Sequence, residues 1–561
     1  MPSLVKKMKG NKAYYYIVQS ARVNGKPRIV WQKYLGTVDG ILKMAEKNLA
    51  PAPSEIELFQ AGGIAALSNI SQKIDLVKII DEIVPKRTQG PSVGQYMLLA
   101  ALNRALNPLS KSQIGEWYGE TSLKRLWNFS SDAFSSQRFW DHMDLIPQEA
   151  IEQIQDKLVG KVKEHFSLEA KNLLYDTTNF FTYINTHNHR NEIAQRGHNK
   201  QKRTDLRQIN LALLATKDFQ IPLFHKIYRG NIPDVKSFSD ISCDLLEKHE
   251  KVFGHSETTL VLDKGHLAEE TMEKLLYKNM HFVSGVKAEF LKKIHEISSD
   301  QLQEIPQVAG TKSFETLVEI YGKSCKAVVS YSESFFTQQL ASVTSSMVKC
   351  QDKLKELQEK LNAYSQKPKG IKPSLVAVKT RIKDILSCPY MKEIFIVSVD
   401  ETTCIPQLQY SVNKEGFDRL TSTRLGRTLL ITNRLEWSAY EVIACYRELE
   451  KIEEVFKHLK NRQYLHWQPA FHWTDHKLTV HSFYCVLAIM LVALARKTAY
   501  ENGLELTFLG LLEELSGIKE VALLYPAEKG KFRTHCSFNK MSPRQKKLAE
   551  IFDIGSILGQ G

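Results

Sequence analysis

The spacing of hydrophobic and polar positions changes several times along the chain, and each change predicts a different kind of element. Residues 13–36 read as two β-rich runs around Asn24-Gly25, a dipeptide that favours a hairpin turn. The proline-containing stretch at 51–54 predicts a linker. From Glu55 to Phe166, apolar residues recur with a helical period in segments that prolines separate. We therefore expect a small β-module followed by a helical domain.

After Lys171 the pattern becomes that of strands and helices together. The first three runs are short, apolar and bounded by polar turns: NLLYD, LRQINLALLAT and IPLFHKIYR. A helical stretch over 234–249 follows them. TTLVLD and HFVSGVK are two further runs of the strand type. Three strands, a helix and then more strands predict an α/β sheet flanked by helices.

Residues 338–362 differ from the rest because their apolar positions alternate in steps of three and four, the heptad spacing of packed helices. The seam consists of Leu340, Val343, Met347, Cys350, Leu354, Leu357 and Leu361. The turn KPKGIKP at 367–373 reverses the chain into a second expected helix near 375–386, which makes a helical hairpin. Packing of the seam inside the chain is the plainer interpretation, and an arm that dimerises or clamps DNA is the alternative.

The longest apolar run, Phe483 to Ala495, has 13 residues and falls short of the roughly 20 that cross a bilayer. It predicts a buried core helix, and no membrane partner is expected. The basic N-terminus lacks an apolar segment of the secretory type, and the eight cysteines are too scattered for a zinc ribbon or a disulfide framework. We expect reduced thiols and a cytoplasmic protein.

The composition is that of a folded protein with an excess of positive charge. Of 561 residues, 43% are hydrophobic and 25% are charged, which argues against a disordered or a membrane-embedded chain. Lys and Arg number 76 against 62 Asp and Glu, a net charge of +14, and residues 1–54 carry ten basic and two acidic side chains. This excess favours a polyanionic partner such as nucleic acid.

Two aspartates end strand-like runs in the α/β region. Asp176 closes LLYD, and Asp263 closes TTLVLD 87 residues later. Strands hold such side chains rigidly while the adjoining loops leave them accessible, so functional groups gather there. Either aspartate alone is weak evidence, because Asp commonly ends strands and caps helices.

A third carboxylate lies on a helix expected over Ala444 to Asn461. The apolar stripe of this helix consists of Ile452, Val455, Phe456 and Leu459, and a neighbouring polar stripe carries Glu453, Lys457 and Lys460. Taken alone, the segment reads as a solvated amphipathic helix. Taken together, three carboxylates in a basic chain are the ligands that two Mg²⁺ ions need for attack on a phosphodiester.

On these residues the sequence resembles the DDE transposases of bacterial insertion sequences, in the IS-four superfamily and its branch of long transposases with a split core. The stretches that carry the resemblance are LLYDTTNFF, RGNIPDVKSF, LVLDKG, LLITN, YRELEKIEEVFKHLK and FHWTDHKLTVHSFYCVLA. The resemblance implies an RNase H-like core with Asp176, Asp263 and Glu453 as catalytic metal ligands. It also implies two Mg²⁺ ions, for which Mn²⁺ can substitute, and double-stranded DNA at transposon ends and target sites as the partner of a homodimer.

The superfamily's Tyr-Arg-Glu-Lys signature falls on Tyr446, Leu449, Glu453 and Lys460, so leucine replaces the arginine. Arg447 offers a guanidinium from another face of the helix. Lys457 and Lys460 lie one or two turns beyond Glu453, where an ammonium can hold a phosphate beside the metal site. We expect both lysines and Tyr446 to contact DNA.

The stretch from His187 to Arg207 has a net charge of +4 and lies between the first two expected core strands, close to Asp176. Arg203 and Arg207 are its expected DNA contacts, although a solvated loop fits the charge equally well. Its histidines lack the cysteines and the regular spacing of a zinc site.

The expected fold class is α/β, with an RNase H-like catalytic core interrupted by an insertion that contains a helical hairpin, because 190 residues separate Asp263 from Glu453. The expected domains are a basic β-rich module at 1–54, a helical DNA-binding domain at 55–166, the core at 168–287 and 426–500, the insertion at 288–425 and a basic C-terminal region at 501–561. The expected function is Mg²⁺-dependent cleavage at terminal inverted repeats and strand transfer into target DNA, by a nucleoid-associated protein of a bacterium or archaeon. A transposase-derived DNA-binding protein without catalysis and an RNase H-like nuclease are the alternatives.

Overall fold

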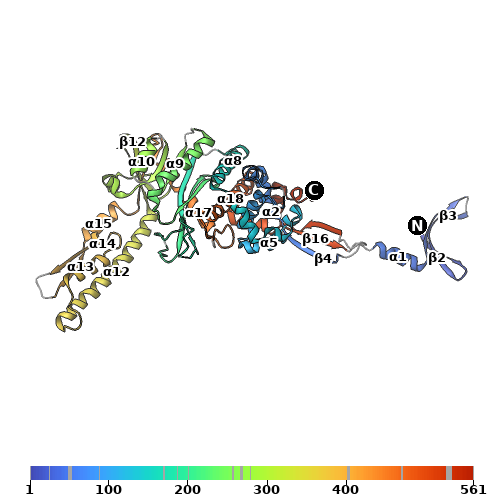
Figure 1. The fold of residues 1–561 in the computed structure, drawn as a ribbon, viewed down its shortest axis with the longest axis horizontal. Helices are drawn as coiled ribbons and strands as arrows, with labels where there is room; N and C mark the ends of the chain where they lie inside the picture. The colour runs from blue at the N-terminus through green and yellow to red at the C-terminus, as the bar shows by residue number, and fades with distance from the viewer. Residues whose placement is uncertain are drawn as a thin grey trace.

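The computed structural model describes residues 2–23, 26–48, 53–87, 89–168, 171–185, 187–199, 201–254, 258–265, 269–277, 280–400, 405–468, 472–525 and 533–559. Figure 1 shows an elongated molecule with a small N-terminal module at one end and a helical hairpin at the other. A helical body and a large sheet lie between them, so the two ends of the molecule are far apart.

The N-terminal module is an antiparallel sheet of β1 (Ser3–Lys9), β2 (Lys12–Val23) and β3 (Lys26–Gly36), followed by α1 (Val38–Asn48). Val23 pairs with Lys26, so the predicted hairpin is confirmed, while its Asn24-Gly25 turn lies outside the described residues. Pro51 and Ala52 of the predicted linker also lie outside them. Val18 is buried, but most of the strand residues are exposed.

The helical body is built from both ends of the remaining chain. Its first part comprises α2 (Gly62–Lys73), α3 (Leu76–Ile83), α4 (Val93–Leu106), α5 (Lys111–Gly119), α6 (Leu123–Trp127), α7 (Ser136–Asp144) and α8 (Gln148–Phe166). Its second part comprises α18 (Asp475–Glu501), α19 (Phe508–Ser516), α20 (Pro543–Ile551) and α21 (Ile554–Ile557). Both parts share one hydrophobic core, which crosses the domain boundaries that we drew near 167 and 500.

Helix α18 lies at the centre of this core. Among the described residues it is the one helix long and apolar enough to cross a membrane, yet 94% of its most apolar window is buried inside the protein. The predicted buried core helix is therefore confirmed.

A small sheet also joins the two ends of the chain. In it β4 (Glu55–Gln60) pairs with β16 (Lys519–Tyr525), which pairs in turn with β17 (Arg533–Phe538). Residues 501–561 carry eight basic and eight acidic side chains, so the expected basic C-terminal region is wrong.

In the described part of the chain, nine strands form one sheet in the order β10-β11-β12-β15-β9-β8-β5-β6-β7. These strands are β5 (Asn172–Thr182), β6 (Arg207–Thr216), β7 (Pro222–Arg229), β8 (Thr259–Leu262), β9 (His281–Gly285), β10 (Gln303–Glu304), β11 (Thr311–Ile320), β12 (Lys323–Ser332) and β15 (Arg427–Thr432). Strands β5, β8 and β9 are parallel neighbours, and the other pairs are antiparallel.

Both faces of this sheet are buried at its centre. Along β8, Val261 contributes to the core shared with the helical body, while Leu260 and Leu262 contribute to a second core. Helices α9 (Asp234–Phe253) and α10 (Glu269–Tyr277) supply residues to the second core. Strands buried on both faces have continuous apolar runs, which explains why TTLVL shows no alternation.

The region between β12 and β15 forms a projecting arm. It comprises α12 (Glu333–Gln366), α13 (Leu375–Ile385), α14 (Met391–Ile394), α15 (Lys414–Thr423) and the hairpin of β13 (Phe395–Asp400) and β14 (Gln407–Val412). The heptad seam of α12 packs in one core with these elements, so the seam is filled from within the chain. The expected insertion is thus divided, because β10, β11 and β12 join the main sheet and the rest projects from it.

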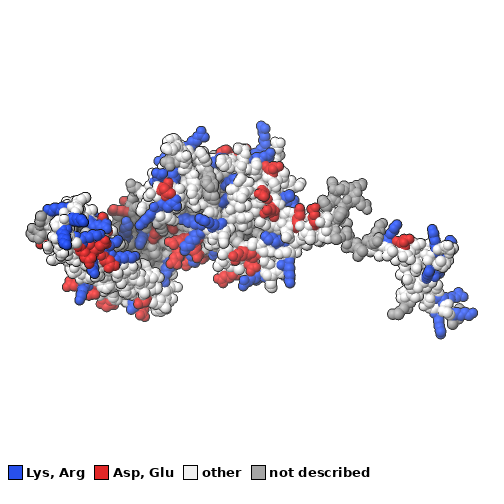
Figure 2. Space-filling view, turned by 90° about the horizontal axis from the view of Figure 1, so that it is seen from below, with Lys and Arg blue, Asp and Glu red and all other residues white. Residues whose placement is uncertain are grey.

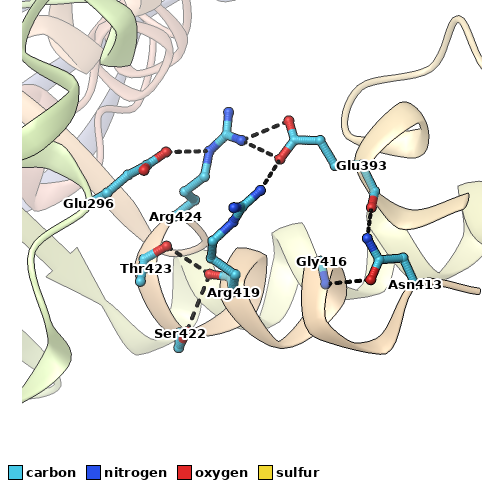
Figure 3. A network of polar contacts seen from close by, with 8 residues as sticks. All are labelled: Glu296, Glu393, Asn413, Gly416, Arg419, Ser422, Thr423 and Arg424. Atoms are coloured by element: carbon cyan, nitrogen blue, oxygen red, sulfur yellow. Dashed lines mark hydrogen bonds and ion pairs between the residues drawn. The ribbon is translucent and has the colours of Figure 1, made fainter. Parts of the chain in front are cut away.

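A network of polar contacts lies where the arm meets the sheet (Figure 3). Arg424, at the end of α15, donates two hydrogen bonds of 2.8 Å to Glu393 of α14. Its Nε also lies 3.7 Å from Glu296, which follows α11 (Lys292–His295). Arg424 thus joins the arm to a segment packed on the main sheet.

Candidate active site

Two parallel strands place two aspartates side by side. In the parallel pairing of β5 with β8, Tyr175 lies opposite Leu262. Asp176 and Asp263 are the next residues in the sequence after this pair. Each aspartate accepts a hydrogen bond on Oδ1 from the backbone N–H of the residue that follows it, at 2.7 Å for Asp176 and 2.8 Å for Asp263. Asp263 directly follows its strand, as expected.

The expectation that Asp176 ends a strand is wrong. β5 continues to Thr182 because its other edge pairs with β6, where Asp176 lies opposite Leu213. The parallel pairing with β8 nevertheless stops at Tyr175, so both carboxylates emerge where the same pair of strands diverges.

Two helices bring the third carboxylate to this place. α16 (Ala439–Arg447) begins with a capping box between Ser438 and Glu441, and α17 (Leu449–Leu459) follows it. The single helix expected over 444–461 is therefore interrupted at Glu448, whose N–H bonds to the carbonyl oxygen of Cys445. The predicted apolar stripe of α17 is buried, and Glu453 is exposed on the polar side.

Asp176, Asp263 and Glu453 line one cleft of about 810 Å³. Glu450, one turn before Glu453, lines it too, as do Tyr446 and Arg447. The fold thus brings together carboxylates that are 87 and 190 residues apart in the sequence.

The carboxylates are acceptable ligands for a divalent cation but do not form a closed metal cage. Among the described residues, no three His, Cys, Asp or Glu side chains lie close enough together to hold a metal ion. Carboxylate oxygens are the donors that Mg²⁺ prefers, and closer approach requires a cation because like charges repel. The donor set of the cleft therefore fits Mg²⁺.

The Tyr446 side chain is part of the same constellation. Its hydroxyl donates a hydrogen bond of 3.2 Å to Oδ1 of Asp263. Burial raises the pKa of Tyr446, and the negative charge of Asp263 raises it further. Tyr446 is therefore a neutral donor to the carboxylate.

Two neighbouring glutamates lie elsewhere. Glu454 lines a separate hollow with Arg496, and Glu448 forms ion pairs with Lys217 and Lys451. Among Glu448, Glu453 and Glu454, Glu453 is the one that lines the cleft with the aspartates, as the helical register favoured.

A comparison with protein families identifies the chain. Residues 181–491 match the model of the transposase DDE domain. The chain belongs to this transposase family. The matched region begins after Asp176 and contains both Asp263 and Glu453. Among curated proteins, none matches the sequence.

Two solved transposase structures are distant likenesses. A piggyBac transposase synaptic complex with hairpin DNA has 9% identity and a TM-score of 0.35, over 83% of this chain and 82% of that one. A Mos1 transposase paired-end complex with the left transposon end has 8% identity and a TM-score of 0.15, over 35% of this chain and 60% of that one. At these TM-scores neither likeness establishes a shared fold.

The two predicted lysines of this transposase have different surroundings. Lys460 donates a hydrogen bond of 2.7 Å to Thr178, which lies two residues beyond Asp176 on β5, and its ammonium lies 5.5 Å from the ring centroid of Phe180. Lys457 is exposed, and neither lysine is among the residues that line the cleft. Lys460 is thus held beside the strand of Asp176, while Lys457 projects from the helix.

The two predicted arginines contact their own loop. Arg203 makes two hydrogen bonds of 2.7 Å to Asp205, and the Arg203 guanidinium lowers the pKa of Asp205 to about 2. Arg207 donates to the carbonyl oxygen of Asn188 at 3.1 Å. Neither arginine lines the cleft.

Sequence reasoning missed the opposite wall of the cleft. Thr311 of β11, Ser330 and Ser332 of β12, and Gln338 of α12 line it, and Arg447 donates to the Thr311 hydroxyl at 3.1 Å. The alternating hydroxyls of SYS at 330–332 were the available signal. That signal was weak, because only the pairing of β12 with β15 brings it to the cleft.

Proposed function

We propose that this transposase cuts DNA at the terminal inverted repeats of its own element and joins the freed 3′-hydroxyls to target DNA. The observation that carries the proposal is the meeting of Asp176, Asp263 and Glu453 in one cleft of a chain that belongs to the transposase DDE family.

In this proposal Asp176, Asp263 and Glu453 hold two Mg²⁺ ions, and Mn²⁺ can substitute. When bound, such ions activate a water or a 3′-hydroxyl and stabilise the leaving oxygen. The aspartates are fixed by adjoining strands, and the glutamate comes from α17, which rests on β5. These residues orient the attacked phosphodiester relative to the groups that cleave it.

We further propose an RNase H-like core built around β5–β9, with β10–β12 and the arm inserted before β15. The strand order β7-β6-β5-β8-β9 supports it, because the antiparallel strands β7, β6 and β5 adjoin the parallel strands β8 and β9. Asp176 lies on β5, and Asp263 directly follows the neighbouring β8. The domain limits expected from the sequence are kept as part of this proposal, with one change: α18–α21 belong to the helical body.

DNA is the proposed partner, bound as transposon ends and as target by a homodimer in the nucleoid. The N-terminal module supports this proposal, because residues 1–54 have ten basic and two acidic side chains. Figure 2 shows Lys and Arg side chains on the surface of this module, at the end of the molecule away from the arm. We propose that Tyr446, Lys457, Lys460, Arg203 and Arg207 contact the DNA backbone.

Purified protein assayed with uncut and pre-cut transposon ends tests the proposal. Cleavage and joining in Mg²⁺, and their loss in chelator, are the expected results. Activity in chelator would remove the two-metal mechanism. Cleavage without joining of pre-cut ends would favour an RNase H-like nuclease, and binding of ends without either reaction would favour a DNA-binding protein derived from a transposase.

A further inference from the structure

A glycine lies directly under the Tyr446 hydroxyl. Gly285 is the last residue of β9, is buried and pairs with Leu430 of β15. A Cβ added there would lie 2.5 Å from Oη and 3.0 Å from Cζ of Tyr446, and 3.2 Å from Cβ of Lys264. Contacts this short force a neighbour to move, so the position of the tyrosine requires the absence of a side chain at 285.

Glycine has no other evident reason to occupy this position. It weakens a strand, because it has no side chain to pack and loses more backbone freedom on folding than any other residue. The backbone of Gly285 does not adopt a left-handed conformation that would demand glycine. The close approach of the phenol is therefore the main feature that excludes larger residues, and Cβ of Lys264 at 3.2 Å adds to it.

The hydroxyl in turn fixes a carboxylate. Tyr446 and the Lys264 N–H both donate to Oδ1 of Asp263, at 3.2 Å and 2.8 Å, so two hydrogen bonds converge on one oxygen. Two donors on a single oxygen restrict rotation of the carboxylate about its Cβ–Cγ bond. Groups that orient a metal ligand in this way commonly change metal affinity or activity by about 10- to 100-fold when removed.

We propose that Tyr446 is a positioning residue for Asp263, and that Gly285 provides the space that lets Tyr446 reach it. The inference rests on the proposed function, because it treats Asp263 as a metal ligand. It adds to that function a residue of β9, which lies outside the three carboxylates and outside the Tyr-Arg-Glu-Lys signature. The arrangement links β8, β9 and α16 at one point of the cleft.

The test is a double-mutant cycle between Gly285→Ala and Tyr446→Phe. Phenylalanine removes Oη, the atom closest to the added Cβ. It leaves Cζ at 3.0 Å and Cβ of Lys264 at 3.2 Å, contacts that shifts of a few tenths of an ångström relieve. Gly160→Ala is the control for adding a methyl group, because Gly160 lies on α8, does not line the cleft, and its added Cβ would meet nothing within 4 Å.

Three properties are measured for each variant: Mn²⁺ binding to the full-length protein on pre-cut end DNA, strand cleavage, and thermal unfolding. Gly285→Ala and Tyr446→Phe should each weaken Mn²⁺ binding and cleavage by about 10- to 100-fold. The double variant should be no worse than Tyr446→Phe alone, since the two changes remove the same hydrogen bond. Gly160→Ala should behave like the unchanged protein.

Three results would overturn the inference. The first is a double variant whose loss of Mn²⁺ binding and cleavage is the product of the two single losses. The second is unchanged Mn²⁺ binding in Tyr446→Phe. The third is a lower melting temperature of Gly285→Ala with full activity per folded molecule. Asp263→Asn separates this failure from failure of the proposed function. If the unchanged protein binds Mn²⁺ no better than Asp263→Asn and cleaves nothing, the proposed function itself is wrong.

Discussion

Asp176 and Asp263 each follow the last paired residue of two adjacent parallel strands, β5 and β8. Neighbouring strands lie roughly 4.8 Å apart, so the register alone sets two carboxylates close together at the edge of a rigid sheet. Glu453 reaches the same cleft from α17, whose apolar face is buried against the core. Two ligands thus come from the sheet and one from a helix that packs on it.

Removal of charge from any one of the three carboxylates should abolish catalysis without abolishing DNA binding. Asp176→Asn, Asp263→Asn and Glu453→Gln keep the shape of each side chain and remove a metal ligand. We expect cleavage and joining to fall below detection while the affinity for transposon ends stays within about twofold, since end binding is dominated by phosphate contacts elsewhere. Gel-shift and strand-transfer assays measure the two properties.

Glu454→Gln is the control for this series, because Glu454 lies on the same helix but lines a different hollow with Arg496. It should be much milder than Glu453→Gln. Full activity in Glu453→Gln would move the third ligand to another glutamate of α17, of which Glu450 is the one that also lines the cleft.

The parts of this site that were predictable from sequence are those that depend on local pattern. An apolar run that stops at Asp263 indicates a strand end, and the spacing of Ile452, Val455 and Leu459 fixes which side of the helix carries Glu453. The continuation of β5 beyond Asp176 was not predictable, because it depends on pairing with β6. The pairing of β4 with β16 joins segments more than 450 residues apart, and no local period records it.

Lys460→Ala should impair cleavage or joining more than folding. The ammonium of Lys460 bonds to Thr178, two residues from Asp176, where it can hold a phosphate beside the carboxylates. A charge-assisted contact of this kind corresponds to a loss of about 10- to 100-fold in rate. Single-turnover cleavage, normalised to folded protein, is the measurement.

Lys457→Ala is the matched control, because Lys457 is exposed on α17 three residues before Lys460. Its effect should be smaller than that of Lys460→Ala, because the bond to Thr178 holds Lys460 beside the strand of Asp176. Equal losses of activity would mean that this bond gives Lys460 no special role. A loss of stability with unchanged activity in Lys460→Ala would favour a helix surface that merely contacts solvent.

Deletion of residues 1–53 should weaken end binding and reduce its dependence on salt. A deletion to Leu168 would also remove helices that share a core with α18, so it would test folding instead. A chain that begins at Ser54 retains the hydrogen bond of Ser54 to Leu524 and the pairing of β4 with β16. The slope of log affinity against log salt should fall by about 0.9 for each DNA phosphate that the module neutralises. Equal affinity, selectivity and slope in the shortened chain would show that the module does not bind the ends.

Arg424→Ala should loosen the attachment of the arm. Arg424 makes both 2.8 Å bonds to Glu393 and lies near Glu296, and its removal leaves two partly buried carboxylates without it. We expect a loss of about 1.5–3 kcal/mol, the range for hydrogen bonds to charged groups. Arg424→Lys should be intermediate, because lysine keeps the charge but has a single nitrogen, whereas Arg424 uses Nη1 toward Glu393 and Nε toward Glu296.

Hydrogen exchange of residues 390–424 and denaturant unfolding measure this effect. Arg419→Ala is the control, because Arg419 lies 3.8 Å from the same Glu393 and its side chain is 64% exposed. It should change stability by less than about 1 kcal/mol. Faster exchange in the Arg419 variant than in the Arg424 variant would assign the attachment to a different contact.

The protein should lose stability as the pH falls below 6.5, in part because of His225. Burial, with a smaller effect from the charge of Lys248, lowers the pKa of His225 to about 3. The folded state therefore keeps this imidazole neutral, while the unfolded chain binds a proton below its ordinary pKa of 6.5. Because the unfolded state takes up more protons, the contribution is constant above pH 6.5 and falls by about 1.4 kcal/mol for each unit below it.

His225→Phe should therefore flatten the decline in stability between pH 6.5 and pH 5. The ring of His225 already stacks on Phe483, with centroids 6.3 Å apart and planes 18° apart, so an aromatic replacement fits the same environment. Thermal unfolding at pH 7.5, 6.0 and 5.0 compares this variant with the unchanged protein and with His187→Gln, a change at an exposed histidine. His187→Gln should leave the decline unaltered. An equally steep decline in His225→Phe would mean that other groups, such as His472 and His481, whose pKa values burial also lowers, account for the acid sensitivity.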